Sequence, residues 1–158
     1  MITEAKDAVV GRKIKTTLLS TEFNYDGNYV EYFGLDPGKS KGLLGNLTKP
    51  MTKIFMDIRV VNEVMQRVVY KIENFDGCAF LNNRVISRIF SRWYDAIVGN
   101  TTHFKCPARP GIYYLENGST TGLVSPYLPA GTFRVSVRVK PVYGGPFAVE
   151  IIWRYMRK

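Results

Sequence analysis

Two hydrophobic periodicities divide this chain, one helical and one typical of strands. Between residues 81 and 98 apolar side chains recur at intervals of one, three or four, which places them on one side of an α-helix. Asn82 or Asn83 can cap the start of this helix, and Gly99 can end it in the left-handed conformation. We therefore predict one amphipathic helix over about residues 81–98, whose inner face carries Leu81, Val85, Ile86, Ile89, Phe90, Trp93, Tyr94, Ile97 and Val98.

The strand pattern is clearest in the last third of the chain. Apolar residues alternate with polar ones over 133–140 and again over 147–155, after a Gly-Gly-Pro turn. Earlier, residues 51–61 and 64–74 predict a hairpin that turns at Asn62-Glu63, with inner residues Val64, Val68, Tyr70 and Ile72. We also predict an opening hairpin from 13–23 and 29–33, a short strand over 112–115, and an irregular connection over the glycine-rich segment 34–50.

About seven antiparallel strands and one helix predict a mostly β fold. We expect an immunoglobulin-like β-sandwich or β-cup, with the amphipathic helix closing one side or one mouth. Residues 1–12 lack periodicity and are expected to form an N-terminal arm. Residues 13–158 are long enough for a single domain with a sizeable core.

The two cysteines, Cys78 and Cys106, bracket the predicted helix. A helix about 27 Å long, followed by an extended return, makes a bond between them geometrically possible, and two buried thiols are the alternative. N-glycosylation acceptor triplets begin at Asn46, Asn100 and Asn117. Disulfides and sequons both favour a secreted, extracellular setting, although the sequence as given carries no apolar leader segment.

The net charge of +9 either attracts polyanions or simply keeps the protein soluble. Arg84, Arg88 and Arg92 are spaced four apart and predict a basic stripe on the outer face of the helix. Such a stripe is either a contact surface for phosphates or lipid headgroups, or an ordinary solvated face.

The residues give little support for catalysis. His103 is the only histidine, and one histidine with two cysteines cannot build the usual zinc clusters. Gly38-Lys39-Ser40 resembles the end of a phosphate-binding loop, but Phe33 occupies the position of the required first glycine and no helix pattern follows. We expect no enzymatic activity, no catalytic residue, no metal site and no cofactor.

An ordered set of motifs resembles a known family. Asp76-Gly77-Cys78-Ala79-Phe80-Leu81 leads into the helix, Asn100 and Lys105-Cys106-Pro107 follow it, and Leu128-Pro129-Ala130-Gly131-Thr132-Phe133-Arg134 leads into a strand. This order resembles an insect family of small secreted proteins that carries a domain of unknown function and includes the CheA/CheB chemosensory proteins. That family is similar in turn to the ganglioside-activator and ML lipid-recognition proteins.

The resemblance extends from about Lys13 to the C-terminus and implies three properties. These are a β-cup with a hydrophobic interior, paired cysteines, and the binding of an apolar ligand in chemosensory fluid. Family members often carry further cysteines in their first third, and this sequence has none before Cys78.

We therefore expect a secreted, non-enzymatic binding protein for a lipid- or pheromone-like ligand, with a chemosensory role. The expected cavity lining is Ile54, Met56, Tyr70, Phe90, Trp93, Phe133, Val135 and Trp153. The alternative is a basic module with no internal ligand that contacts a protein, such as a membrane receptor, or an anionic membrane surface. Nucleic acid is not an expected partner in either case.

Overall fold

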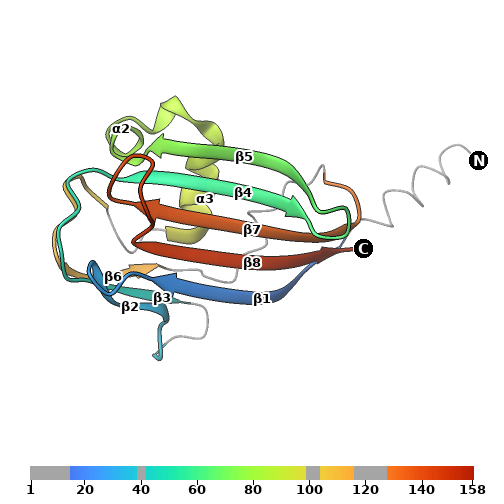
Figure 1. Ribbon diagram of the computed structural model, residues 1–158, viewed down its shortest axis with the longest axis horizontal. Coiled ribbons are helices and arrows are strands. Elements are labelled where there is room, and N and C mark those ends of the chain that lie inside the picture. Colours follow the sequence, from blue (N-terminus) through green and yellow to red (C-terminus); the bar gives the residue numbers. More distant parts are fainter. Residues whose placement is uncertain (1–14, 39–41, 99–103, 116–127) are drawn as a thin grey trace, which may run out of the picture.

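Two antiparallel sheets face each other in the computed structural model, which describes residues 15–38, 42–98, 104–115 and 128–158 (Figure 1). The larger sheet has five strands in the order β1-β8-β7-β4-β5, and the smaller has three in the order β2-β3-β6. The strands are β1 (Thr16–Tyr25), β2 (Val30–Leu35), β3 (Leu43–Leu47), β4 (Phe55–Asn62), β5 (Arg67–Asp76), β6 (Gly111–Leu115), β7 (Gly131–Lys140) and β8 (Val149–Arg157). The predicted mostly β sandwich with a helix is confirmed.

The centre of the core is the pair β7 and β8, where the predicted alternation is confirmed. Phe133 lies opposite Tyr155 and Val135 lies opposite Trp153, and all four side chains are fully buried. Each large aromatic side chain removes on the order of 150–250 Å² from water, so this strand pair carries much of the hydrophobic stabilisation.

The predicted helix over residues 81–98 is divided into three elements. These are α2 (Gly77–Asn82), the 3₁₀ turn η1 (Arg84–Ile86) and α3 (Arg88–Val98). Asn83 and Ser87 both have extended backbone conformations, and each accepts a hydrogen bond from an amide in the element that follows it. Such side chains compete with a continuing helix, which explains the two interruptions.

Three of the residues predicted on the inner face of the helix are exposed instead, so that part of the prediction is wrong. Val85, Ile86 and Ile89 are 82%, 51% and 51% exposed, whereas Phe90 and Val98 are buried. The chain leaves the helix axis at Ser87, so Val85 and Ile86 do not share the rotational phase of α3. Ile89 lies within α3, in its exposed first turn.

The predicted opening hairpin is wrong, because β1 and β2 belong to different sheets. β1 pairs with β8, and β2 pairs with β3. Asp26 stabilises the crossing between the layers: its side chain accepts from the Asn28 amide, and its own amide donates to the carbonyl of Ala148, the residue before β8.

The glycine-rich segment 34–50 was predicted to be irregular, yet it contains β3. A Cβ atom at Gly45 would lie 3.3 Å from the Phe33 ring. Gly45 therefore permits close packing within a strand instead of marking a loop.

The predicted hairpin of β4 and β5 is confirmed, but its turn covers residues 63–66. Val64 and Val68 are exposed, so only Tyr70 and Ile72 of the four expected inner residues face the core. The register shifts between Val60 and Val61, and such a bulge changes which side chains face inward.

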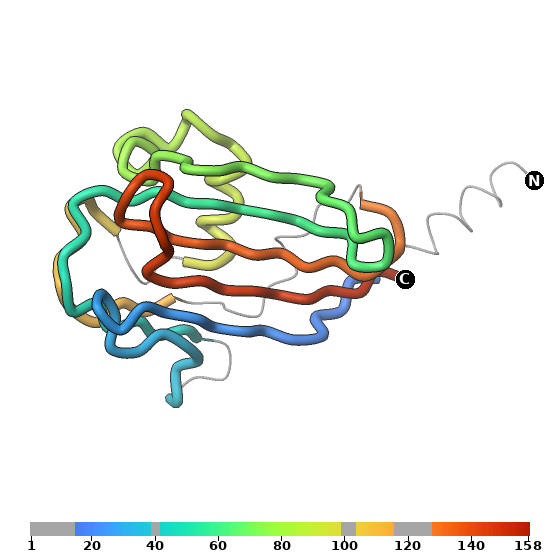
Figure 2. Tube along the Cα trace, in the orientation of Figure 1, coloured from blue at the N-terminus to red at the C-terminus, as the bar shows by residue number. Residues whose placement is uncertain are grey.

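In Figure 1 α3 crosses behind β5, β4 and β7, and the smaller sheet lies beside β1. The Cα trace in Figure 2 shows the same arrangement.

A disulfide joins Cys78 in α2 to Cys106 in the segment before β6, with 5.5 Å between their Cα atoms. Among the described residues, no helix is long and apolar enough to cross a bilayer. The expected arm, residues 1–12, lies outside the described part of the chain.

Candidate ligand-binding cavity

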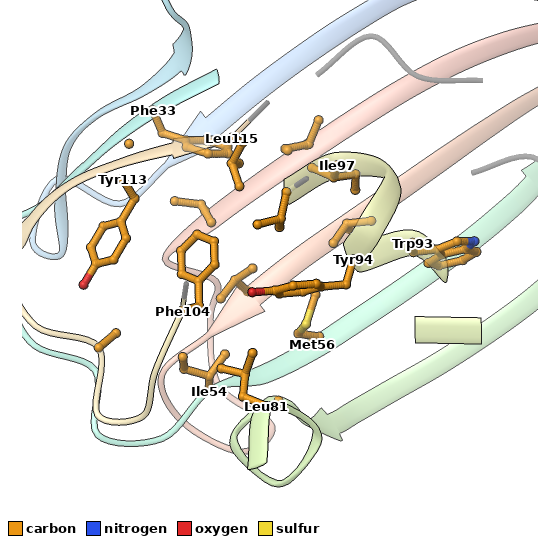
Figure 3. Close-up of a pocket in the computed structure, with 18 of the residues that line it drawn as sticks. Phe33, Ile54, Met56, Leu81, Trp93, Tyr94, Ile97, Phe104, Tyr113 and Leu115 are labelled. Atoms are coloured by element: carbon orange, nitrogen blue, oxygen red, sulfur yellow. The ribbon is translucent and has the colours of Figure 1, made fainter. Parts of the chain in front are cut away.

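A cavity of about 230 Å³ lies between the two sheets and α3 (Figure 3). The inner faces of β4, β7 and β8 form one wall, the smaller sheet forms the opposite wall, and α2 and α3 close a side. The strand alternation explains this arrangement, because every second residue of β4 and β7 projects towards the same interior. Figure 3 labels ten of the lining residues: Phe33, Ile54, Met56, Leu81, Trp93, Tyr94, Ile97, Phe104, Tyr113 and Leu115.

A continuous series of aromatic contacts forms the side of the cavity where the two sheets are not joined. The Tyr70 ring on β5 packs edge-on against Trp93, and Phe75 stacks on Phe90 with 3.7 Å between ring centroids. The series continues from Phe80 through Tyr94 and Phe104 to Tyr113 on β6. Each favourable ring pair contributes about 0.5–1.5 kcal/mol beyond its buried area, so the helix is held firmly between the sheet edges.

The described lining is almost entirely hydrocarbon. None of its side chains is charged, and N–H or O–H groups occur there only on Trp93, Tyr94, Tyr113 and Trp153. The described residues also contain no cluster of three or more His, Cys, Asp or Glu side chains that could hold a metal. Such a lining offers water few of the two or more polar partners that it needs. The arrangement therefore favours an apolar ligand over water.

Five of the eight expected lining residues contribute to the cavity: Ile54, Met56, Phe90, Trp93 and Trp153. The other three, Tyr70, Phe133 and Val135, lie outside the lining. Phe133 and Val135 are fully buried nearer the start of β7, and Tyr70 packs edge-on against Trp93. Periodicity identifies the inward face of a strand, but it does not show at which end of that strand the layers separate.

Sequence reasoning missed the lining residues of the smaller sheet, which include Phe33, Leu47, Tyr113 and Leu115. These residues belong to β2, β3 and β6. The glycine-rich pattern of 34–50 predicts a connection, so the second sheet was not expected. The apolar residues around Gly45 were the available indication.

The three arginines do not form one helical stripe. Arg88 and Arg92 lie exposed on α3, whereas Arg84 lies on η1 and forms an ion pair of 2.5 Å with Asp95. The Arg84 guanidinium also lies 4.7 Å from the centroid of the Tyr94 ring. All three arginines are exposed, but Arg84 is engaged with Asp95 and with the cavity wall.

The remaining predicted sites are largely outside the described residues. Asn46 is described and lies in β3, not in a loop, where its side-chain amide donates to Glu31. Asn100, Asn117, His103 and the Lys39-Ser40 pair lie outside the described ranges.

Comparison with known protein families gives one match. A family model described as "Protein of unknown function (DUF1091)" matches residues 52–135, just over half of the 158-residue chain. The matched segment includes both cysteines, α2 and α3, and it runs from just before β4 into β7. The comparison with curated proteins gave no match.

Proposed function

We propose that this chain, which belongs to the DUF1091 family of proteins of unknown function, is a non-enzymatic protein that binds a small hydrophobic ligand in the cavity between its sheets. The observation that carries the proposal is the cavity itself, about 230 Å³ of space with an apolar described lining. A well-packed interior of this size would leave few voids larger than a water molecule.

The cavity volume bounds the ligand. At about 30 Å³ for each water-sized group, 230 Å³ holds a chain of roughly eight carbons. Burying about eight methylenes contributes on the order of 6 kcal/mol before ordering costs. That free energy corresponds to a dissociation constant between about millimolar and micromolar. We infer a compact ligand, such as a short lipid chain or a volatile pheromone-like molecule.

We further propose that the protein is a secreted, chemosensory carrier similar to the CheA/CheB proteins and to the ML lipid-recognition proteins. The Cys78–Cys106 disulfide supports it, because such bonds persist mainly in oxidising compartments. The order of motifs around the two cysteines and the strand at Phe133 supports it as well.

Intrinsic fluorescence can test ligand binding, because both tryptophans of the chain, Trp93 and Trp153, line the cavity. Titration with octan-1-ol should change the tryptophan emission until the cavity is saturated. The substitution Val139→Phe should lower the affinity at least about tenfold, because the added ring takes up space that the ligand needs. Val69→Phe is the matched control, since Val69 is an exposed strand residue of β5 and should leave the affinity unchanged.

Two results would reject the proposal. One is the absence of a saturable change in emission with any short alcohol, provided that calorimetry also detects no heat of binding. The other is equal loss of affinity in Val139→Phe and Val69→Phe.

A second candidate function, contact with an anionic membrane surface, is favoured by the exposed segment around η1. Val85, Ile86 and Ile89 expose apolar side chains beside the cationic Arg88 and Arg92. An apolar tip flanked by arginines suits the boundary between lipid headgroups and acyl chains. Each basic residue near an anionic surface contributes about 1 kcal/mol, and salt screens that attraction.

Co-sedimentation with vesicles tests this candidate. One set of vesicles is pure phosphatidylcholine, and in the other about one lipid in three is phosphatidylserine. Arg88→Glu with Arg92→Glu should reduce binding to the anionic vesicles more than tenfold. Arg67→Glu with Lys158→Glu changes the net charge equally at exposed positions elsewhere and should have little effect. Equal losses in the two double variants would show that only net charge matters and would reject a specific surface.

A further inference from the structure

The described cavity wall presents one hydroxyl that has no hydrogen-bond partner among the described residues. The Tyr113 hydroxyl donates to the Arg109 carbonyl, and the Trp93 indole nitrogen points away from the other lining side chains in Figure 3. Trp153 is fully buried, and no buried side-chain nitrogen or oxygen of the described residues lacks a partner. The Tyr94 hydroxyl makes no hydrogen bond to any described residue and is not fully buried, and Figure 3 shows it among the side chains that line the cavity.

The ring of Tyr94 is held in place from several sides. Its centroid lies 5.9 Å from that of Phe80 and 6.4 Å from that of Phe104, and the Arg84 guanidinium lies 4.7 Å from it. Arg84 is itself bound by Asp95 and by the Ser91 side chain. Figure 3 shows the ring extending from α3 towards Phe104 with the hydroxyl at its far end. A ligand that bonds this hydroxyl therefore loses little affinity to the ordering of a loose side chain.

We propose that the ligands of this cavity are neutral oxygenated molecules, such as an alcohol, aldehyde or ester, whose single oxygen hydrogen-bonds to Tyr94. This inference rests on the proposed ligand-binding function and adds the chemical class of the ligand. A phenolic hydroxyl can donate to a carbonyl and can also accept from an alcohol. Once the ligand excludes water from the site, that bond is stronger than it would be in solution.

The same observation disfavours two other classes of ligand. A pure hydrocarbon would exclude water from the Tyr94 hydroxyl and leave it buried without a partner, and an unsatisfied buried donor opposes binding. An ionised fatty acid would bring a carboxylate among described lining residues that carry no positive charge. The Arg84 guanidinium on the Tyr94 ring is already paired with Asp95.

Binding of octane, octan-1-ol and ionised octanoate to the full chain and to Tyr94→Phe tests the inference. In the unmodified chain octan-1-ol should bind best. Tyr94→Phe should weaken octan-1-ol binding about three- to tenfold, the range expected for one net hydrogen bond, and should leave octane binding unchanged or stronger. Tyr143→Phe is the matched control, because Tyr143 is 68% exposed and does not line the cavity.

The outcomes separate this inference from the function on which it rests. If octane and octan-1-ol both bind and Tyr94→Phe changes neither affinity, the ligand class assigned here is wrong while the cavity remains a binding site. Stronger binding of octanoate than of octan-1-ol would overturn it as well. If none of the three compounds binds the unmodified chain, both the inference and the proposed function fail.

Discussion

Individual polar residues join strands at points that the hydrophobic pattern does not specify. Glu63, in the turn between β4 and β5, accepts two hydrogen bonds from the Arg154 guanidinium on β8, at 2.8 and 3.0 Å. These bonds lower the pKa of the Glu63 carboxyl from its ordinary value of 4.5, and partial burial acts in the opposite direction. A paired guanidinium and carboxylate with two parallel bonds fixes orientation better than a single contact does.

Arg154→Gln should raise the pKa of Glu63 towards 4.5, because the main cause of its lowering is removed. A carboxyl whose pKa is lower in the folded than in the unfolded chain stabilises the fold above the unfolded value. That stabilisation is lost as the pH falls through the folded value. The difference in free energy of unfolding between the two proteins should therefore be present at pH 7 and shrink as the pH falls below about 4. It should be small, because both side chains are partly exposed.

The measurement combines an NMR titration of the Glu63 carboxyl with urea unfolding at several pH values. Arg134→Gln is the control, since Arg134 acts on Glu63 only through charge and ranks last among the causes. A stability difference that is the same at all pH values would contradict this account.

At the scale of elements, local hydrogen bonding determines where the helical segment is divided. The Phe90 amide donates to the Ser87 side-chain oxygen, so Ser87 satisfies a donor in the first turn of α3. Ser87→Ala should lower the free energy of unfolding by about 1 kcal/mol, as loss of such a cap usually does. Ser91→Ala, within α3, should be nearly neutral, because alanine is favourable inside a helix and the Arg84 contact that it loses is exposed. Equal effects of the two substitutions on the urea midpoint would contradict the capping role.

The sequence predicted α3, the β4–β5 hairpin and the final two strands, because each has a strong internal period. It did not predict how β1 and β2 pair, since strands that are adjacent along the chain carry the same alternation whether they share a sheet or not. The sequence did not predict the smaller sheet for a similar reason. Gly45 is read as a loop residue unless the Phe33 ring that packs on it is known.

At the scale of the whole molecule, the cavity results from three partly independent walls. The larger sheet is continuous, while the smaller sheet and α3 cover different parts of the described inner face. The sequence could identify residues of the larger sheet and of α3, such as Met56, Trp93 and Trp153, as lining candidates. The opposite wall depends on long-range packing between β2, β3 and β6, which periodicity does not encode.

The disulfide connects these walls, because its two ends flank lining residues. Gly77 precedes Cys78, and both Phe104 and Ala108 lie within two residues of Cys106. Cys78→Ala with Cys106→Ala should lower the free energy of unfolding by about 3 kcal/mol, the amount expected for a closed loop of this size. The separation of 28 residues sets that estimate.

The same double variant should also bind octan-1-ol more weakly, because α2 and the segment before β6 would no longer be fixed relative to each other. We expect at least a threefold loss of affinity, measured by calorimetry at a temperature where the far-ultraviolet spectrum shows that the variant is folded. Ser87→Ala is the appropriate control, since it also destabilises the protein but leaves both ends of the disulfide in place. If the two variants bound octan-1-ol with the same affinity as the unmodified chain, the disulfide would stabilise the fold without shaping the cavity.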